Sequence, residues 1–269
     1  MNMCVRIALV SILNERHRIS MRKHYVDNLR WIVIFLLVPY HAAMAWNTWG
    51  EPNYIYFESN KIISSIVVFF SPYFMPLMFL IAGGLPLPFL GELLSTGGKS
   101  FAEYTYVFLV GYYIFSNDDA VSRAEKYKWI FLCTGITATV FNVYLFVWSG
   151  TRHTLLNMAA KYVSEWFMIN FLTGAGKRYL NFDGKVLKYM SKRSYSFYIF
   201  HFIWVVLFQY LLFHVCGGNI ILLYALPVLC AYVATMICCE ICNRIYDMPA
   251  LRRFRPSVRR AGYSEGLRK

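Results

Sequence analysis

Charged side chains are scarce in this sequence: Asp, Glu, Lys and Arg make up 15% of its 269 residues. A soluble domain of this size carries about 25% charged residues. Hydrophobic residues account for 58% of the chain, and the mean hydropathy is +0.43. This shortage of charge excludes an ordinary soluble globular domain and places the chain among integral membrane proteins.

Acidic residues are the scarcer of the two signs, 14 against 27 Lys and Arg, which gives a net charge of +13. The basic residues gather in hydrophilic stretches: 23 of the 27 lie in residues 1–30, 116–128, 176–194 and 244–269. Cytoplasmic loops of membrane proteins collect Lys and Arg in this way. We therefore interpret the basic excess as a topology signal with anionic lipid as its partner, and expect no nucleic-acid binding.

A paired cysteine framework is also missing. The chain has seven cysteines, most of them inside apolar runs. Cys239 and Cys242 form a CxxC pattern, but no His or second CxxC lies near it in the sequence. We predict no metal site and interpret these cysteines as small buried apolar residues.

The apolar runs predict an all-α fold, a polytopic transmembrane bundle of about seven helices that form one domain. Most runs reach the approximately 20 residues needed to cross a bilayer. We expect an N-terminal extension over 1–21 with little structure, a transmembrane domain over 22–245, and a basic cytoplasmic tail over 246–269. The predicted helices are 30–49, 62–83, 101–115, 129–149, 154–174, 195–215 and 219–242.

Seven helices do not satisfy the charge pattern. Counting back from a cytoplasmic C-terminus, 176–194 and 116–128 are cytoplasmic as expected, but helix 62–83 must then run outward. Helix 30–49 must also run outward because six basic residues lie within 1–30. Either the stretch 85–95 enters the membrane, or an odd number of helices is missing near 84–100.

Two residues are out of place in the first predicted helix: Arg30 at its start and His41 within it. Eleven steps of about 100° bring both side chains onto one stripe, roughly 16 Å apart along the axis, with Asp27 near the same stripe. An ionisable residue within a membrane helix indicates a functional site, and imidazole transfers protons near neutral pH. The alternative is a His bonded to a neighbouring helix, with Arg30 as a cytoplasmic anchor.

Several motifs resemble, in order, those of the acyltransferase 3 family. They are DNLR with a His eleven residues after Arg30, MPLMFLIAG (75–83), FLVGYYIFSNDD (108–119), EKYKW (125–129), and KRYLNFDGKVLKYMSKRSYSFYIFHF (177–202) with its Ser194, Tyr198 and His201. The proteins that succinylate osmoregulated glucans are the most similar branch. The resemblance covers most of residues 22–245.

The resemblance implies a multi-pass acyltransferase of a prokaryotic plasma membrane. It would use acyl-CoA as co-substrate, with no tightly bound cofactor, and a hydroxyl of a glycan or similar compound as acceptor. His41 would be the general base, or would carry the acyl group itself, and Arg30 would hold the CoA end. Asp27 accompanies them, and His201 is a weaker candidate because a packing histidine explains it equally well.

The chain also departs from the family pattern. Members typically have about ten helices and a basic Arg-x-x-Arg loop after the second, whereas here residues 85–100 lead directly into what resembles a much later helix. An internal deletion near 84–100 explains this gap. The alternatives to an active acyltransferase are a transporter-like bundle, in which Arg30 and His41 line a solute path, and an inactive truncated membrane protein.

Overall fold

The computed structural model describes residues 23–51, 53–82, 95–96, 99–100, 117–152, 154–216 and 218–247, and in this part of the chain it is a helical bundle. Its one ladder is an antiparallel pair of two-residue strands, in which Ser95 faces Ser100. The elements are α2 (His24–Ala43), η1 (Met44–Trp46), α3 (Lys61–Ala82), β1 (Ser95–Thr96), β2 (Lys99–Ser100), α5 (Asp118–Lys126), α6 (Lys128–Val143), η3 (Tyr144–Trp148), α7 (Leu155–Tyr179), α8 (Lys185–Phe213) and α9 (Ile220–Asp247).

The predicted all-α fold is confirmed. Six of the seven predicted spans are helices, and the seventh, 101–115, lies outside the described residues, as do the N-terminal extension and nearly all of the tail. Among the described residues, four helices are long and apolar enough to cross a membrane. They are His24–Trp46, Lys128–Trp148, Lys185–Phe213 and Ile220–Ile245.

Both stretches that were predicted as cytoplasmic loops are largely helical. The 116–128 stretch contains α5, an amphipathic helix with acidic residues in its first turn and basic residues in its last, as a helix dipole favours. The 176–194 stretch is divided between the end of α7 and the first turns of α8. Lys and Arg are good helix formers and extend their charged ends to water, so a basic stretch need not end a helix.

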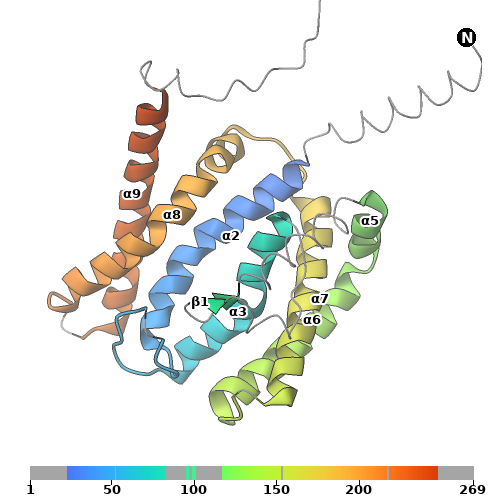
Figure 1. Ribbon diagram of the computed structural model, residues 1–269, viewed down its shortest axis with the longest axis horizontal. Helices are drawn as coiled ribbons and strands as arrows, with labels where there is room; N and C mark the ends of the chain where they lie inside the picture. Colours follow the sequence, from blue (N-terminus) through green and yellow to red (C-terminus); the bar gives the residue numbers. More distant parts are fainter. Residues whose placement is uncertain are drawn as a thin grey trace, which may run out of the picture.

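Helix α2 runs through the middle of the bundle, between α8 and α9 on one side and α3 and α7 on the other (Figure 1). Its most apolar stretch is 56% buried, against 22–28% for the other three candidate spans. Most residues in those three stretches are not buried in the bundle, as expected for helices that face lipid on one side. The helix that carries Arg30 and His41 is therefore the central helix of the bundle.

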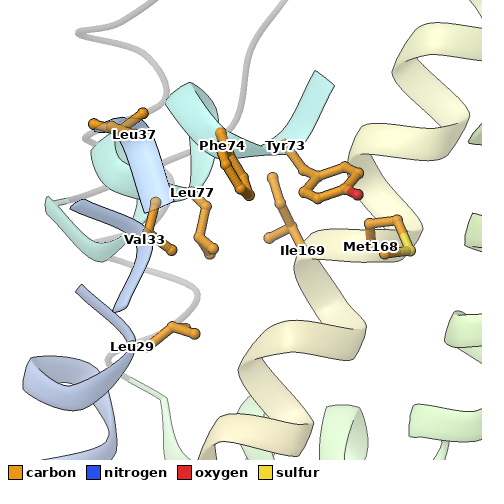
Figure 2. Packing of buried hydrophobic residues seen from close by; sticks show 8 residues of the cluster. All are labelled: Leu29, Val33, Leu37, Tyr73, Phe74, Leu77, Met168 and Ile169. Carbon is orange, nitrogen blue, oxygen red and sulfur yellow. The ribbon is translucent and has the colours of Figure 1, made fainter. Parts of the chain in front are cut away.

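Two rows of side chains on α2 pack on its two sides. Leu29, Val33 and Leu37 pack against α3 and α7. They form a buried cluster there with residues that include Leu77 of α3 and Ile169 of α7 (Figure 2). The second row packs against α8 and α9. It consists of Ile34, Val38 and Ala42, which meet Phe197, Val205, Ala231 and Cys239. Cys239 thus lies in an apolar cluster, as expected for a small buried residue.

The start of α2, α5, the end of α7, the start of α8 and the end of α9 lie at one end of the bundle, here called the basic end (Figure 1). The contacts that join them are Lys23 Nζ to Asp118 Oδ1 (2.7 Å), Lys177 Nζ to Glu125 Oε2 (3.3 Å), Asn28 Nδ2 to the Leu180 carbonyl (2.6 Å) and Arg193 Nη2 to Glu240 Oε1 (2.7 Å). Side chains of all the described basic stretches thus lie together, as the positive-inside pattern requires.

Helix α3 runs antiparallel to α2. It begins beside the end of α2, where Ser64 Oγ donates to the Trp46 carbonyl (3.2 Å), and it ends toward the basic end, where α5 begins (Figure 1). The end of α3 and the start of α5 therefore lie on the same side of the bundle. The connection between them, which includes the predicted span 101–115, lies largely outside the described residues.

Polar and small residues join α6 to α7. Thr139 Oγ1 and Ser164 Oγ lie 2.6 Å apart, and Asn157 Nδ2 donates to Asn142 Oδ1 (3.0 Å). Because the hydrocarbon of a bilayer offers no partners, such groups bond to one another between membrane helices. These bonds hold α6 against α7.

Gly174 sets the distance between α7 and α5, which yields a stability prediction. A Cβ there would lie 2.4 Å from the Ala124 carbonyl oxygen, whereas at Gly176 the nearest atom is 3.7 Å away. Since backbone cannot yield as a side chain can, we expect Gly174→Ala to destabilise the bundle by about 1–3 kcal/mol. Thermal unfolding in detergent measures this, with Gly176→Ala as control. Equal unfolding temperatures for the two variants would contradict the close approach.

Candidate functional site

Arg30 and His41 lie on a helix that is continuous from His24 to Ala43. At about 100° per residue, their stripe falls between the row of Leu37 and the row of Ile34. Those rows belong to the two different apolar clusters. The stripe therefore follows the seam between the two sides of the bundle, and the two side chains do not lie on opposite flanks of the helix.

Pro39 lies one turn before the end of α2. Proline has no N–H, so it leaves the carbonyl of Phe35 without its helical donor. Tyr232 of α9 donates its hydroxyl to that carbonyl (2.8 Å), and Tyr224 donates to the Pro39 carbonyl (3.3 Å). Neighbouring helices satisfy freed backbone groups in membrane proteins in this manner, and here the two bonds hold α2 against α9 beside His41.

The end of α2 is held from α8 as well. Gln209 is fully buried, and its Nε2 donates to the Ala42 carbonyl (2.8 Å) in the last turn of α2. The α2 helix ends two residues after His41. The imidazole therefore lies in the last helical turn, where the following segment of chain can reach it.

His41 is half-buried in a group of aromatic rings that come from three elements. Its Nδ1 is hydrogen-bonded to the Tyr54 hydroxyl (2.5 Å), and the His201 ring lies 5.2 Å away between centroids. Phe202 and Tyr40 lie edge-on to the imidazole at 5.2 and 5.3 Å. We call His41, His201, Tyr54 and Phe202 the histidine site.

Tyr54 belongs to the segment 47–60, which folds over the end of α2. Asn47 begins it with an amide oxygen that accepts from the backbone N–H groups of Trp49 (3.0 Å) and Gly50 (2.6 Å). The Phe57 N–H donates back to the Ala45 carbonyl (2.9 Å). Burial, and then the nearby Tyr40 and Glu51, raise the pKa of the Tyr54 phenol, so it keeps its proton.

His201 is 2% exposed and lies on the buried face of α8 with Ser194, Val205 and Gln209. Its Nδ1 is 3.2 Å from the Phe197 carbonyl oxygen one turn back. Its Nε2 is buried and has no hydrogen-bond partner among the described residues. A buried polar atom left unpaired costs about 1–3 kcal/mol, so packing alone does not account for this histidine.

Arg30 lies at the basic end with its side chain 37% exposed. Its Nη1 is 3.4 Å from Asp27 Oδ1, a long contact that uses one of the five donors of the guanidinium. The other donors can therefore serve a bound anion. Asp27 thus contacts Arg30 rather than the histidine site.

The structure brings together His41 and His201 and leaves Arg30 and Asp27 at the basic end. The predicted helix 195–215 would place His201 near its start, but α8 begins at Lys185, so His201 lies well inside the helix. Tyr54 lies between the predicted helices 30–49 and 62–83 and was not among the predicted site residues, yet it bonds to His41. No local pattern in the sequence distinguishes it from the neighbouring aromatics.

Two cavities lie elsewhere in the bundle. One, of about 340 Å³, is lined by Met236, Glu240 and Arg244 of α9, and the other, of about 350 Å³, lies between α3 and α6. Neither is lined by a residue of the histidine site. Within the described residues, no group of three His, Cys, Asp or Glu side chains is arranged to hold a metal ion.

The family model of the acyltransferase 3 proteins, described as an acyltransferase domain, matches residues 84–244, more than half of the chain. The matched range includes His201 and excludes Arg30 and His41, which pack against it from α2. Neither the curated proteins nor the solved structures gave a match.

Proposed function

This chain belongs to the acyltransferase 3 family of membrane proteins, and we propose that it transfers an acyl group from an acyl-CoA-type donor to a hydroxyl of a glycan or similar acceptor. The observation that carries the proposal is the contact of His41 with His201, two imidazoles on the central helix and its neighbour, 5.2 Å apart between centroids. Acyl transfer to a hydroxyl needs a group that removes the hydroxyl proton, and imidazole does this near neutral pH.

The bundle around the histidine site suits this chemistry. His41 is half-buried, and the buried His201 lies beside it between α2 and α8, with the two rings 5.2 Å apart between centroids. Phe202 and Tyr40 lie edge-on against the imidazole and would shield part of it from water. A shielded site of this kind strengthens each hydrogen bond to the reacting atoms and protects the thioester from hydrolysis.

Arg30 is the proposed anchor of the donor. Its guanidinium can bind a phosphate group with two parallel hydrogen bonds. It lies on the stripe of His41, roughly 16 Å from it along the helix axis. A thioester on an extended CoA arm can span this distance, so the nucleotide would remain at the basic end while the acyl group reaches His41.

The charge pattern supports an orientation for the protein. The basic end would face the cytoplasm, where acyl-CoA is made, and the C-terminus after α9 would be cytoplasmic. A prokaryotic plasma membrane is the proposed location, and the glucan-succinylating branch of the family supplies the proposed acyl group. The proposed location and acyl group are both based on the resemblance of the sequence motifs to those of this branch.

An internal deletion between α3 and α5 is part of the proposal. The end of α3 and the start of α5 lie on one side of the bundle, whereas the single predicted span 101–115 would place them on opposite sides. Loss of an odd number of helices explains the conflict. The genomic sequence around the codons for residues 84–100 tests it, since missing helices encoded in another frame would show an artefactual gap.

The experiment that tests the activity uses the purified protein in lipid nanodiscs with labelled succinyl-CoA and methyl β-glucoside. We expect labelled ester, detected by mass spectrometry, in amounts that exceed those with empty nanodiscs. Nanodiscs enclose no volume, so a transporter would give no signal. Uptake of the glucoside into sealed vesicles without ester formation would contradict the proposal and favour a transporter.

A further inference from the structure

We infer that His201, through Nε2, is the residue that takes the proton of the acceptor hydroxyl, and that His41 is a hydrogen-bond donor in the same step. The inference rests on the proposed function, and it changes the role that the family resemblance assigns to His41. The inference is based on which ring nitrogen of each histidine carries the proton. The proton of His201 is placed from a carbonyl, which can only accept, and that of His41 from the relative strengths of a phenol and an imidazole as donors and acceptors.

His201 has the more definite protonation state. Its Nδ1 faces the Phe197 carbonyl oxygen at 3.2 Å. A carbonyl can only accept, so Nδ1 carries the proton of the neutral imidazole, and Nε2 carries a lone pair. This lone pair is buried and has no partner among the described residues. The Nε2 lone pair can therefore accept a proton from a bound hydroxyl.

His41 has the opposite arrangement. Its Nδ1 meets the Tyr54 hydroxyl at 2.5 Å. A phenol is a stronger donor than a neutral imidazole N–H, and the bare nitrogen of imidazole is a stronger acceptor than a phenol oxygen. Tyr54 therefore donates to Nδ1, and the proton of the neutral His41 ring lies on Nε2. Nε2 of His41 is therefore a hydrogen-bond donor, whereas Nε2 of His201 is an acceptor.

These roles complete an acyl transfer in which every atom is accounted for. The acceptor hydroxyl gives its proton to His201 Nε2 as its oxygen bonds to the thioester carbon. The His41 Nε2–H donates to the oxygen that becomes negative at that carbon, as a neutral imidazole can. The carbon–sulfur bond then breaks, and His201 returns the proton to the thiolate. The products are the ester and the free thiol.

Two substitutions separate the functions of the His201 ring. Asparagine places its amide N–H near the position of Nδ1, so His201→Asn can keep the bond to Phe197 while it removes Nε2. Glutamine reaches the position of Nε2 but cannot take a proton. We expect His201→Asn to lower kcat/KM by about 10²–10⁴-fold, and His201→Gln to keep KM within about threefold while kcat falls similarly. His214→Asn, at the exposed end of α8, should change neither.

The nanodisc assay with succinyl-CoA and methyl β-glucoside gives these constants. Activity of His201→Asn within about threefold of the wild type would overturn the role of His201. Inactive wild-type protein would instead overturn the proposed function. Nitrogen NMR of histidine-labelled protein then still decides the hydrogen-bond arrangement, with signals assigned from His201→Asn and His41→Asn. We expect an unprotonated Nε2 in His201 and a protonated Nε2 in His41, and the reverse pattern would overturn the inference.

Discussion

Replacement of His41 by asparagine is expected to lower kcat/KM for acyl transfer by about 10²–10⁴-fold, the contribution of one positioned proton-transfer or donor group. Asparagine can keep a hydrogen bond to Tyr54 because its amide lies near the position of Nδ1. The ring atom that would face the substrate is lost. The loss is therefore expected in kcat, with the bundle intact, and the nanodisc assay measures it.

A fold control accompanies this variant. His41 lies in the last turn of α2, whose end is held by the Gln209 bond to the Ala42 carbonyl (2.8 Å) and does not depend on the imidazole. The thermal unfolding temperature of His41→Asn should therefore match that of the wild type. Transfer that survives the substitution within about threefold would refute any direct role of His41.

Replacement of Arg30 by glutamine is expected to raise KM for acyl-CoA by about tenfold, which corresponds to about 1.4 kcal/mol of lost binding. The guanidinium lies at the basic end with one long contact to Asp27 (3.4 Å), so most of its donors are available for a phosphate. Because it lies far from the histidine site along α2, kcat should change little.

A shorter donor makes this prediction specific. An acyl-pantetheine thioester lacks the nucleotide phosphates, so Arg30→Gln should not change its KM. Arg178→Gln removes another exposed charge at the same end of the bundle and controls for the general attraction of anions. An equal rise of KM for both donors, or for both variants, would contradict phosphate binding by Arg30.

The helices could be predicted from the sequence because a membrane helix is encoded in one long apolar run. The basic stretches were harder. Lys185 and Lys188 begin α8 even though they suggested a loop, since long charged side chains can remain in a helix and extend to water. The conflict near residues 84–100 was visible from charge alone, because orientation depends on where Lys and Arg gather.

Only part of the histidine site could be predicted. The spacing of Arg30 and His41 gives their common stripe because helix geometry is regular. The approach of His201 depends on how α8 packs against α2, and that of Tyr54 depends on the path of the segment 47–60. Neither packing nor loop path follows from local periodicity. Which histidine is the base and which is the hydrogen-bond donor depends on where the ring protons lie. Those positions follow from the contacts of His41 with Tyr54 and of His201 with the Phe197 carbonyl, which the sequence does not show.

A double-mutant cycle tests most directly the claim that the two imidazoles form one reaction centre. The rates of ester formation are compared for the wild type, His41→Asn, His201→Asn and the variant with both changes. Residues that act as a unit are strongly non-additive, so the double variant should be no more than about threefold slower than the slower single variant. A double variant slowed by the product of the two single losses would contradict a shared centre.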